Sequence, residues 1–413
     1  MTAASTNPQV GEGSNSHIFW RFWTAGTVSN CGSAVTKVAL PLVAVLVLQS
    51  SSAQVGSLTA AETVAWLLLG LPAGVIVGRF PLRGTQVAMD LGRAAAIVSV
   101  PLAAALHVLS FWQLLLVALL TGLANVIFDV GNSTFLPSIT SKEELTRRNS
   151  LYNGSYAATE LGAPSLAGLL VQAIGAAACL LIDAVSYVIS AIFLWTLPRP
   201  AQPAPAEHVR TATLIREGLG YVLRHKTVLP CVIAAALVNM TCGALMTLAP
   251  LYLVRYLRTP VGLYGIIIAA EGAGGMLGAT AAAFLQRRFG SARAVLLATT
   301  CGGLAVLLLP LSGRGPALIS YAVGSVVFTM GVAILSILTR SHRQAFTPRE
   351  LLPRVMATVR FISWGTVPVG AIASGLLATA TGIHVALWLA CVPALLVPVI
   401  LWLSPVRGQR DLS

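Results

Sequence analysis

The stretch Gly70–Arg93, GLPAGVIVGRFPLRGTQVAMDLGR, decides how this chain folds. One apolar segment ends at Arg79-Phe80-Pro81-Leu82-Arg83, and a second apolar segment begins within a few residues. Two hydrophobic helices joined by such a short, basic link must run antiparallel, with the link in water at a membrane surface. A similar link, Arg288-Phe289-Gly290, follows about half a chain later. This repetition predicts a duplicated membrane protein.

The composition excludes a water-soluble globular protein. Hydrophobic residues make up 56% of the chain and charged residues only 9%, whereas a soluble domain has roughly 25% charged residues. The net charge of +13 is spread as small clusters between apolar segments. That distribution is typical of residues that set membrane topology, so nucleic acid is not an expected partner.

The apolar segments predict an all-α integral membrane protein. A spanning helix needs about 20 mostly apolar residues, and we expect twelve such helices in two pseudo-symmetric six-helix halves. They lie at about 18–48, 54–78, 85–106, 111–136, 149–172, 176–197, 228–253, 262–286, 292–312, 316–338, 354–380 and 382–404. We expect a disordered tail at 1–16, bundles at 17–197 and 228–404, a linker at 198–227, and a second tail at 405–413.

Basic residues predict the orientation in the membrane. Lys and Arg concentrate in every second link, beginning with the link that holds Arg79 and Arg83, which places those links and both termini in the cytoplasm. The linker opens as a Pro/Ala-rich spacer and continues as the amphipathic segment 213–226, which we expect on the cytoplasmic leaflet. The predicted location is the cell membrane, crossed many times.

A second repeat supports duplication. Gly162, Pro164 and Gly168 in one predicted helix have counterparts in Gly365, Pro368 and Gly375, in the same order, about half a chain later. Repeated six-helix halves with a binding site at their interface are typical of secondary transporters.

Several stretches together resemble one transporter family. They include Val38-Ala-Leu-Pro41, Leu71-Pro-Ala-Gly74, Asp90-Leu-Gly-Arg93, Phe128-Asp129, Tyr264-Gly265 and Ala357-Thr-Val-Arg360-Phe361. The chain resembles the major facilitator superfamily, and within it the bacterial exporters related to macrolide efflux and enterobactin export. The resemblance covers nearly the whole chain and implies a twelve-helix transporter that works by alternating access.

Two motifs implied by this resemblance are only partly present. The loop motif is represented by Gly74, Arg79, Arg83, Asp90 and Arg93, but Gly78 stands where the family has an Asp that helps to latch the two halves, and Pro81 replaces a later Gly. The antiporter-type motif of the fifth helix is represented by Gly154, Gly162, Pro164 and Gly168, with Ala163 and Ala167 at positions often taken by Pro or Gly.

Ionisable residues within the apolar segments are candidates for function. A charge in the hydrocarbon costs roughly 2.5–3.5 kcal/mol, so it is expected to face a cavity or a partner. We assign proton coupling to Glu160 and Glu271, because the resembled fold makes their helices neighbours across the two halves and a desolvated carboxyl there could exchange a proton. The alternative is a Glu hydrogen-bonded to a neighbouring helix or exposed in a wet cleft.

Other charged residues suggest pairs. Asp129 and Arg360 lie near the cytoplasmic ends of their helices, and we predict that they form a cytoplasmic gate in one state; a permanent salt bridge is the alternative. Lys37 and Glu62 could form a structural ion pair, or contribute to coupling or substrate contact. Asp183 is expected to be structural.

The helices that face the cavity in the resembled fold supply further candidates, listed as Asn30, Lys37, Glu62, Asn125, Asn239, Met240, Met246 and Trp364. Apolar walls with a few polar groups suit a bulky amphiphilic ligand. For each of these residues, simple packing is the alternative.

The sequence has no G-x-x-x-x-G-K-[ST] motif, so ATP is not the expected energy source. The scattered histidines offer no spacing suited to a metal, and no catalytic constellation predicts an enzyme. We therefore predict export of a drug-like or natural-product molecule, macrolide- or siderophore-like, by a monomer that uses the proton gradient and no cofactor. The expected partners are the substrate, protons and membrane lipids; the alternatives are a lipid or lysophospholipid flippase and a transport-dead receptor.

Overall fold

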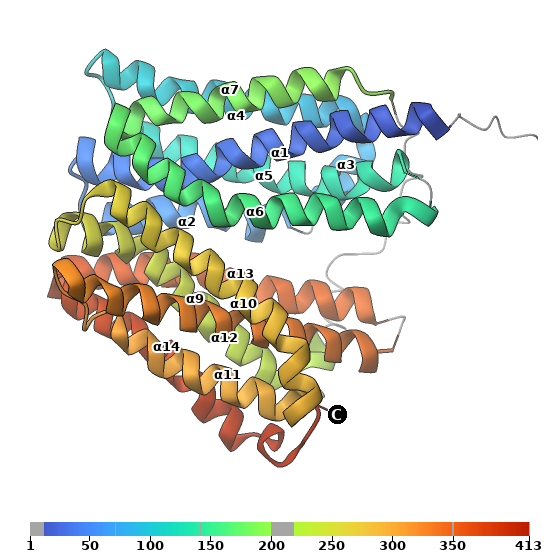
Figure 1. Cartoon of the computed structure of the whole chain (residues 1–413), viewed down its shortest axis with the longest axis vertical. Coiled ribbons are helices and arrows are strands. Elements are labelled where there is room, and N and C mark those ends of the chain that lie inside the picture. Colours follow the sequence, from blue (N-terminus) through green and yellow to red (C-terminus); the bar gives the residue numbers. More distant parts are fainter. Residues whose placement is uncertain (1–11, 71, 141, 200–218, 349–350, 413) are drawn as a thin grey trace, which may run out of the picture.

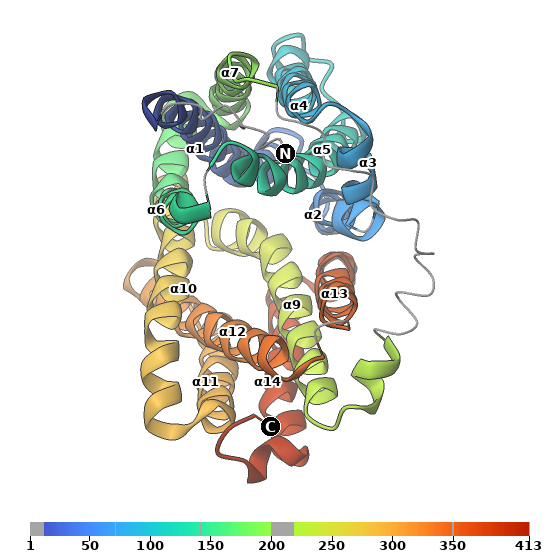
Figure 2. The ribbon, with the colours of Figure 1, turned by 90° about the vertical axis from the view of Figure 1, so that its right-hand side faces the viewer.

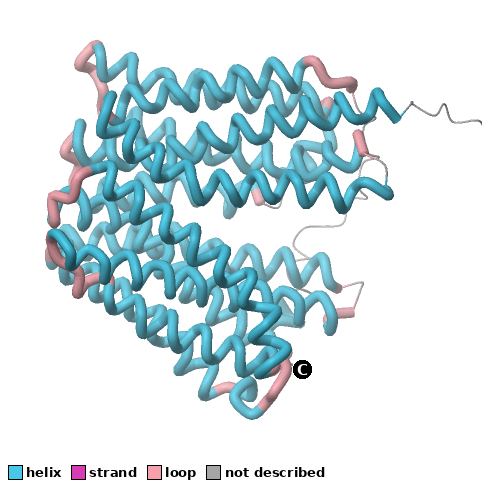
Figure 3. The backbone as a smooth tube through the Cα atoms, viewed as in Figure 1, coloured by secondary structure: helices cyan, strands magenta, loops and turns pink. Residues whose placement is uncertain are grey.

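The computed structural model describes residues 12–70, 72–140, 142–199, 219–348 and 351–412. This described part consists of helices joined by short turns and contains no strand (Figure 3). The predicted tail at 1–16 lies mostly outside it, and the predicted tail at 405–413 begins with the short helix η5, Pro405–Gly408. The all-α fold class is confirmed.

The helices form two groups, which lie one above the other in Figure 1. The first group contains α1 Glu12–Leu42, η1 Val43–Val47, α2 Ser52–Leu69, α3 Ala73–Arg79, α4 Leu82–Ala105, α5 Phe111–Ser138, α6 Lys142–Ile174 and α7 Ala176–Trp195. The second contains α9 Val228–Ala249, η2 Pro250–Tyr256, α10 Val261–Phe289, α11 Ser291–Ala305, η3 Val306–Leu308, η4 Gly315–Ala317, α12 Leu318–Phe346, α13 Leu352–Thr381 and α14 Ile383–Leu403.

Eleven helical segments in the described residues are long and apolar enough to span a membrane. The one expected helix missing from these eleven is the second, at 54–78, which is divided into α2 and α3. Pro72 lies between the two parts, and proline both lacks a backbone N–H and clashes with the preceding helical turn. The chain therefore still crosses here, but in two pieces.

The two groups repeat each other in detail. The first helix of each group ends in a π-helical segment, η1 in one and η2 in the other, a rare conformation that occurs mostly as short insertions. The last two helices of each group meet at one glycine, Gly175 (φ 87°) or Gly382 (φ 88°). Positive φ is costly for residues with a Cβ, so glycine suits both turns. These shared irregularities match the predicted duplication.

The two groups converge at one end and diverge at the other (Figure 1). We call the converging end, which holds the turns 48–51 and 257–260, the closed end. The opposite end, viewed in Figure 2, is the open end, and it holds the first residues of α1 and the last described residues of the chain. Arg79, Arg83, Arg287 and Arg288 lie at the open end, so the prediction that the basic links are cytoplasmic would place this end in the cytoplasm.

The surface is apolar, as expected for a chain in a bilayer. Large hydrophobic side chains such as those of Trp112, Ile319 and Leu403 are exposed on the helices. Of the predicted linker, residues 219–224 are helical, and Val222 is buried with Val228 and Val355 against α9 and α13. Residues 200–218 lie outside the described part, so the domain boundaries at 197 and 228 stay predictions.

Candidate functional site: the cavity between the two halves

A cavity of about 750 Å³ lies between the two groups of helices. The first group contributes the end of α2 and one residue of α5, and the second contributes faces of α9, α12 and α13. The lining residues that matter for the argument are Trp66, Asn239, Arg340, Arg343, Arg360 and Trp364. The volume is that of a typical small-molecule site, which spans roughly 300–1,000 Å³.

An aromatic and cationic cluster joins the two groups at this cavity. Trp66 of α2 and Trp364 of α13 have ring centroids 6.2 Å apart, and the Arg360 guanidinium lies 4.1 Å from the centre of the Trp66 ring. Cation–π contact of this kind is attractive. The cavity wall therefore already brings side chains from both halves together.

Hydrogen bonds join the two groups at the closed end. Arg255 in η2 donates to the carbonyl oxygens of Ser50 (2.7 Å) and Val45 (3.0 Å) in and beyond η1. The backbone N–H of Ala53 on α2 donates to Thr379 Oγ1 on α13 (3.1 Å). These bonds hold the first group to the second on the side of the protein away from the cavity mouth.

Glycines allow close helix contact at the closed end. A Cβ on Gly168 of α6 would lie 2.7 Å from Gly265 Cα of α10, and one on Gly375 of α13 would lie 3.0 Å from Gly56 Cα of α2. Small residues permit such backbone approach between membrane helices. Of the predicted helix-5 motif, Gly168 serves this contact, whereas Gly154 and Gly162 face open space.

Glu160 on α6 forms an ion pair with Lys37 on α1, at 2.5 Å between Nζ and Oε1. The expected ion-pair partner of Lys37 was Glu62, and that pairing is wrong. Glu62 lies on α2, within electrostatic range of Lys37 but without a direct bond to it. The side chains of Lys37 and Glu160 are 47% and 38% exposed, so the pair borders open space between the helices.

Glu271 lies on α10 opposite the backbone of Glu160. A Cβ on its neighbour Gly272 would lie 3.1 Å from the Glu160 carbonyl oxygen, which places the two residues across the α6–α10 contact. Thr329 donates to the backbone carbonyl of Glu271 (2.9 Å). In the described part of the chain the Glu271 carboxylate has no ion pair, so the two interface carboxylates differ in their surroundings.

Asp129 and Arg360 do not form an ion pair in this structure. They lie within electrostatic range of each other, but the Arg360 guanidinium contacts Trp66 instead. A gate between them belongs to a state in which the open end is closed, so it stays a prediction.

A buried network that the sequence did not predict lies inside the first group. Arg93 pairs with Asp90, donates to Asn125 Oδ1 (2.6 Å), and lies 4.2 Å from the ring centres of both Phe128 and Tyr187. The amide of Asn125, expected in the cavity, is therefore directed into this network. The signal was available, because a charge pair at i and i+3 within an apolar helix must find partners inside the protein.

The remaining candidates are distributed around this core. Arg83 donates to the carbonyl of Leu197 (2.8 Å), and Arg79 ends α3; the motif residue Gly74 lies within α3. Asn239 lines the cavity and donates to its own helix at Ala235, and Met246 is exposed elsewhere on α9. The cavity lining does not include Asn30 or Met240. Asn30 lies beside Tyr152, and the Met240 carbonyl faces Gly370.

Asp183, expected to be structural, lies between two helices of the first group, and its role stays a prediction. It is fully buried, and it accepts a hydrogen bond from Thr36 Oγ1 (2.5 Å) between α7 and α1.

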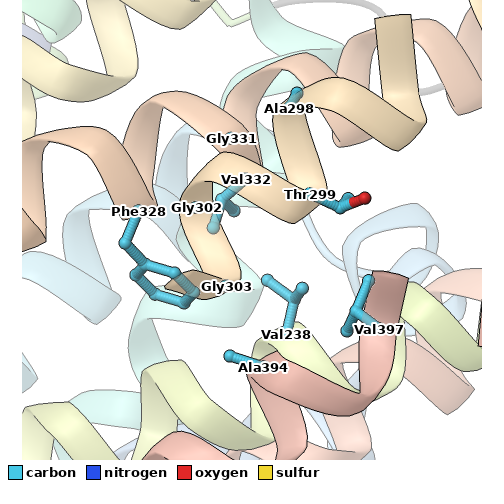
Figure 4. A pocket seen from close by; sticks show the side chains of 10 residues that line it. All are labelled: Val238, Ala298, Thr299, Gly302, Gly303, Phe328, Gly331, Val332, Ala394 and Val397. Carbon is cyan, nitrogen blue, oxygen red and sulfur yellow. The ribbon is translucent and has the colours of Figure 1, made fainter. Parts of the chain in front are cut away.

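A second, much smaller cavity lies within the second group, lined by α9, α11, α12 and α14 (Figure 4). Its volume is about 10 Å³, and glycines, alanines and valines make up most of its wall. A space of this size holds at most one water molecule. It is a packing defect and not a ligand site.

The chain matches the transmembrane secretion effector family over residues 14–412. Among curated relatives, the multidrug efflux pump Tap of Mycolicibacterium fortuitum is 25% identical over 94% of this chain and 96% of its own length. The uncharacterized MFS-type transporter YfiS of Bacillus subtilis is 25% identical over 87% of this chain and 86% of its own length.

Solved structures of transporters share the fold. A mutant form of the nucleoside transporter NupG superposes with a TM-score of 0.80 at 12% identity, covering 93% of this chain and 98% of that one. A bacterial homologue of the iron transporter ferroportin, in an inward-facing state, has a TM-score of 0.77 at 17% identity, covering 94% and 98%. The predicted twelve-helix, two-half architecture is thereby confirmed.

Proposed function

Because the chain belongs to the transmembrane secretion effector family of major facilitator transporters, we propose that it exports a small organic molecule in exchange for protons. The single observation that carries the proposal is the cavity of about 750 Å³ between the two halves. Its wall combines aromatic, aliphatic and polar side chains with three arginines, and concave sites that join apolar surface to a limited set of polar groups bind small organic molecules.

Alternating access is the mechanism we propose. The closed end is held by Arg255 and by the Gly168–Gly265 contact, while the cavity lies toward the open end. For export, the ligand enters from the cytoplasm, the halves close over it, and the bonds at the closed end break. Any ligand or proton that drives this change must bind one state more tightly than the other.

We propose that Glu160 and Glu271 couple the cycle to protons in different ways. A proton on Glu160 would break its ion pair with Lys37, freeing α1 from α6. A proton on Glu271 would neutralise a charge that has no ion-pair partner in the described residues, at the α6–α10 contact between the halves. The Lys37–Glu160 pair joins two helices of the first half, whereas Glu271 lies at the contact between the halves, where a rocking motion must be controlled.

The test uses proteoliposomes and three dansyl probes that share a fluorophore: dansylglycine, dansylamide and dansylcadaverine. An imposed pH gradient should drive accumulation of at least one probe, and collapse of the gradient should abolish it. Glu271→Gln should uncouple uptake from the gradient, whereas Glu144→Gln should not, because Glu144 pairs with Arg148 away from the interface. Uptake that ignores the gradient would refute proton coupling.

A susceptibility screen in a pump-deficient host that expresses the chain is the direct way to find drugs among its substrates.

A further inference from the structure

The cavity wall is strongly cationic. Arg340 and Arg343 of α12 and Arg360 of α13 all line it, and neither Asp nor Glu is among its described lining residues. Like charges on one wall repel each other, and the repulsion is larger where water is excluded. No acidic residue among the described lining residues balances the positive charge of the three arginines.

Arg343 is the most deeply buried of these three arginines. Its side chain is only 7% exposed, and its Nε and Nη1 atoms have no hydrogen-bond partner within the residues that the structure describes. The Ser363 hydroxyl, on the same cavity wall and buried, is also without a partner there. A buried guanidinium without an acceptor is strongly unfavourable, so this arrangement suits a negatively charged ligand.

No ion pair among the described residues joins an acidic residue of the facing half to Arg340, Arg343 or Arg360. Glu160 is paired with Lys37, and Asp129, although within electrostatic range of Arg360, forms no ion pair with it. Membrane topology alone would explain arginines that extend to lipid headgroups. It does not explain Arg343, which is buried against the cavity.

We propose that the cavity selects amphiphilic organic anions, with a carboxylate, sulfonate or phosphate held by Arg343 together with Arg340, which lies one helical turn away. A guanidinium binds such groups through two parallel N–H···O bonds. Trp66 and Trp364 form the adjacent wall and receive the aromatic or apolar body of the ligand. This inference deepens the proposed export function and rests on it.

Binding of the dansyl series tests the proposal directly. Energy transfer from tryptophan to dansyl is measured on the purified full-length protein in phosphatidylcholine nanodiscs. Dansylglycine, the anion, should bind about tenfold or more tightly than neutral dansylamide or cationic dansylcadaverine, as expected for charge-assisted hydrogen bonds. The preference should weaken as salt concentration rises.

Matched variants locate the anion. Arg343→Gln should abolish the preference for dansylglycine, and Arg343→Lys should retain part of it. Arg287→Gln removes the same charge from an exposed position on α10 outside the cavity, and it should leave the preference intact. Thermal unfolding in detergent verifies that each variant folds; if Arg343→Gln does not, Arg340→Gln takes its place.

The outcomes separate this inference from the transport function. Equal binding of the three probes, or equal effects of Arg343→Gln and Arg287→Gln, would overturn the anion site even if uptake continued. Selective binding of dansylglycine without any uptake would support the site and refute transport. Displacement of dansylglycine by lysophosphatidylglycerol but not by lysophosphatidylcholine would identify the anion as a lipid headgroup, whereas no displacement would identify a soluble anion.

Discussion

Replacing Gly168 by alanine should shift the transporter away from the state seen here. The new Cβ would lie 2.7 Å from Gly265 Cα and 2.7 Å from the Val261 carbonyl oxygen, and both of these are backbone atoms. Carbon atoms in good contact are about 3.5–4.0 Å apart, so α6 and α10 must separate by about 1 Å at the closed end.

The size of the shift follows from the cost of overpacking. Inserting a methyl group into a packed contact typically costs about 1–3 kcal/mol. The cost falls only on the state in which α6 and α10 touch, so the equilibrium should move toward opening of the closed end by about 5-fold to 150-fold. Gly162→Ala is the matched control on the same helix, because a Cβ there meets no atom within 4 Å.

Distances between spin labels measure this equilibrium. Labels at His107 and Arg314, which lie in exposed turns of the two halves at the closed end, report its opening in a cysteine-free background. Gly168→Ala should add a population at longer distance, and Gly162→Ala should not. If the two variants gave the same distribution, the glycine contact would not be what holds the closed end together.

Three further predictions concern charged residues. Arg255→Gln removes two charge-assisted hydrogen bonds, each worth about 1.5–3 kcal/mol, and should produce the same longer label distances. An unchanged distribution would show that Arg255 does not hold the closed end together. Arg93→Met leaves the fully buried Asp90 without its cation, so it should lower the free energy of unfolding by about 3–5 kcal/mol and lower the melting temperature. Adding Asp90→Asn should recover part of the lost stability, and no recovery would contradict the pairing. Lys37→Met should reduce proton-driven uptake of the dansyl probes, and adding Glu160→Gln should restore exchange without response to the gradient; full coupling in the double variant would refute the role of the pair.

The sequence is sufficient for the architecture because each spanning helix must satisfy its own backbone hydrogen bonds. The spacing of the apolar segments therefore predicts the helices and their antiparallel order, and the repeated Arg-Phe links and Gly/Pro positions predict the duplication. It does not predict the division of the second helix, because Pro72 interrupts the helix without interrupting the hydrophobic pattern that spans the membrane.

The partners of individual charges are harder to predict. The sequence makes an ion pair between Lys37 and Glu62 plausible because pairing would reduce the cost of two charges within apolar segments, but α1 packs along α6 closely enough for Glu160 to reach Lys37. Helical periodicity shows which residues share a face of a helix. It does not show which neighbouring helix that face contacts. The basic wall of the cavity escapes prediction for a related reason, since the charge pattern alone explains Arg340 and Arg343 as topology determinants.

The hydrogen bonds that Arg255 makes at the closed end have a consequence for how pH affects this protein. Arg255 binds main-chain oxygens of Ser50 and Val45 and not a carboxylate. Those acceptors are main-chain carbonyl oxygens, so a change of pH does not remove these two hydrogen bonds. The Lys37–Glu160 contact, by contrast, contains an acid. The hydrogen bonds that hold the closed end therefore do not respond to protons, and a proton gradient must act on the cycle through ionisable side chains elsewhere in the protein.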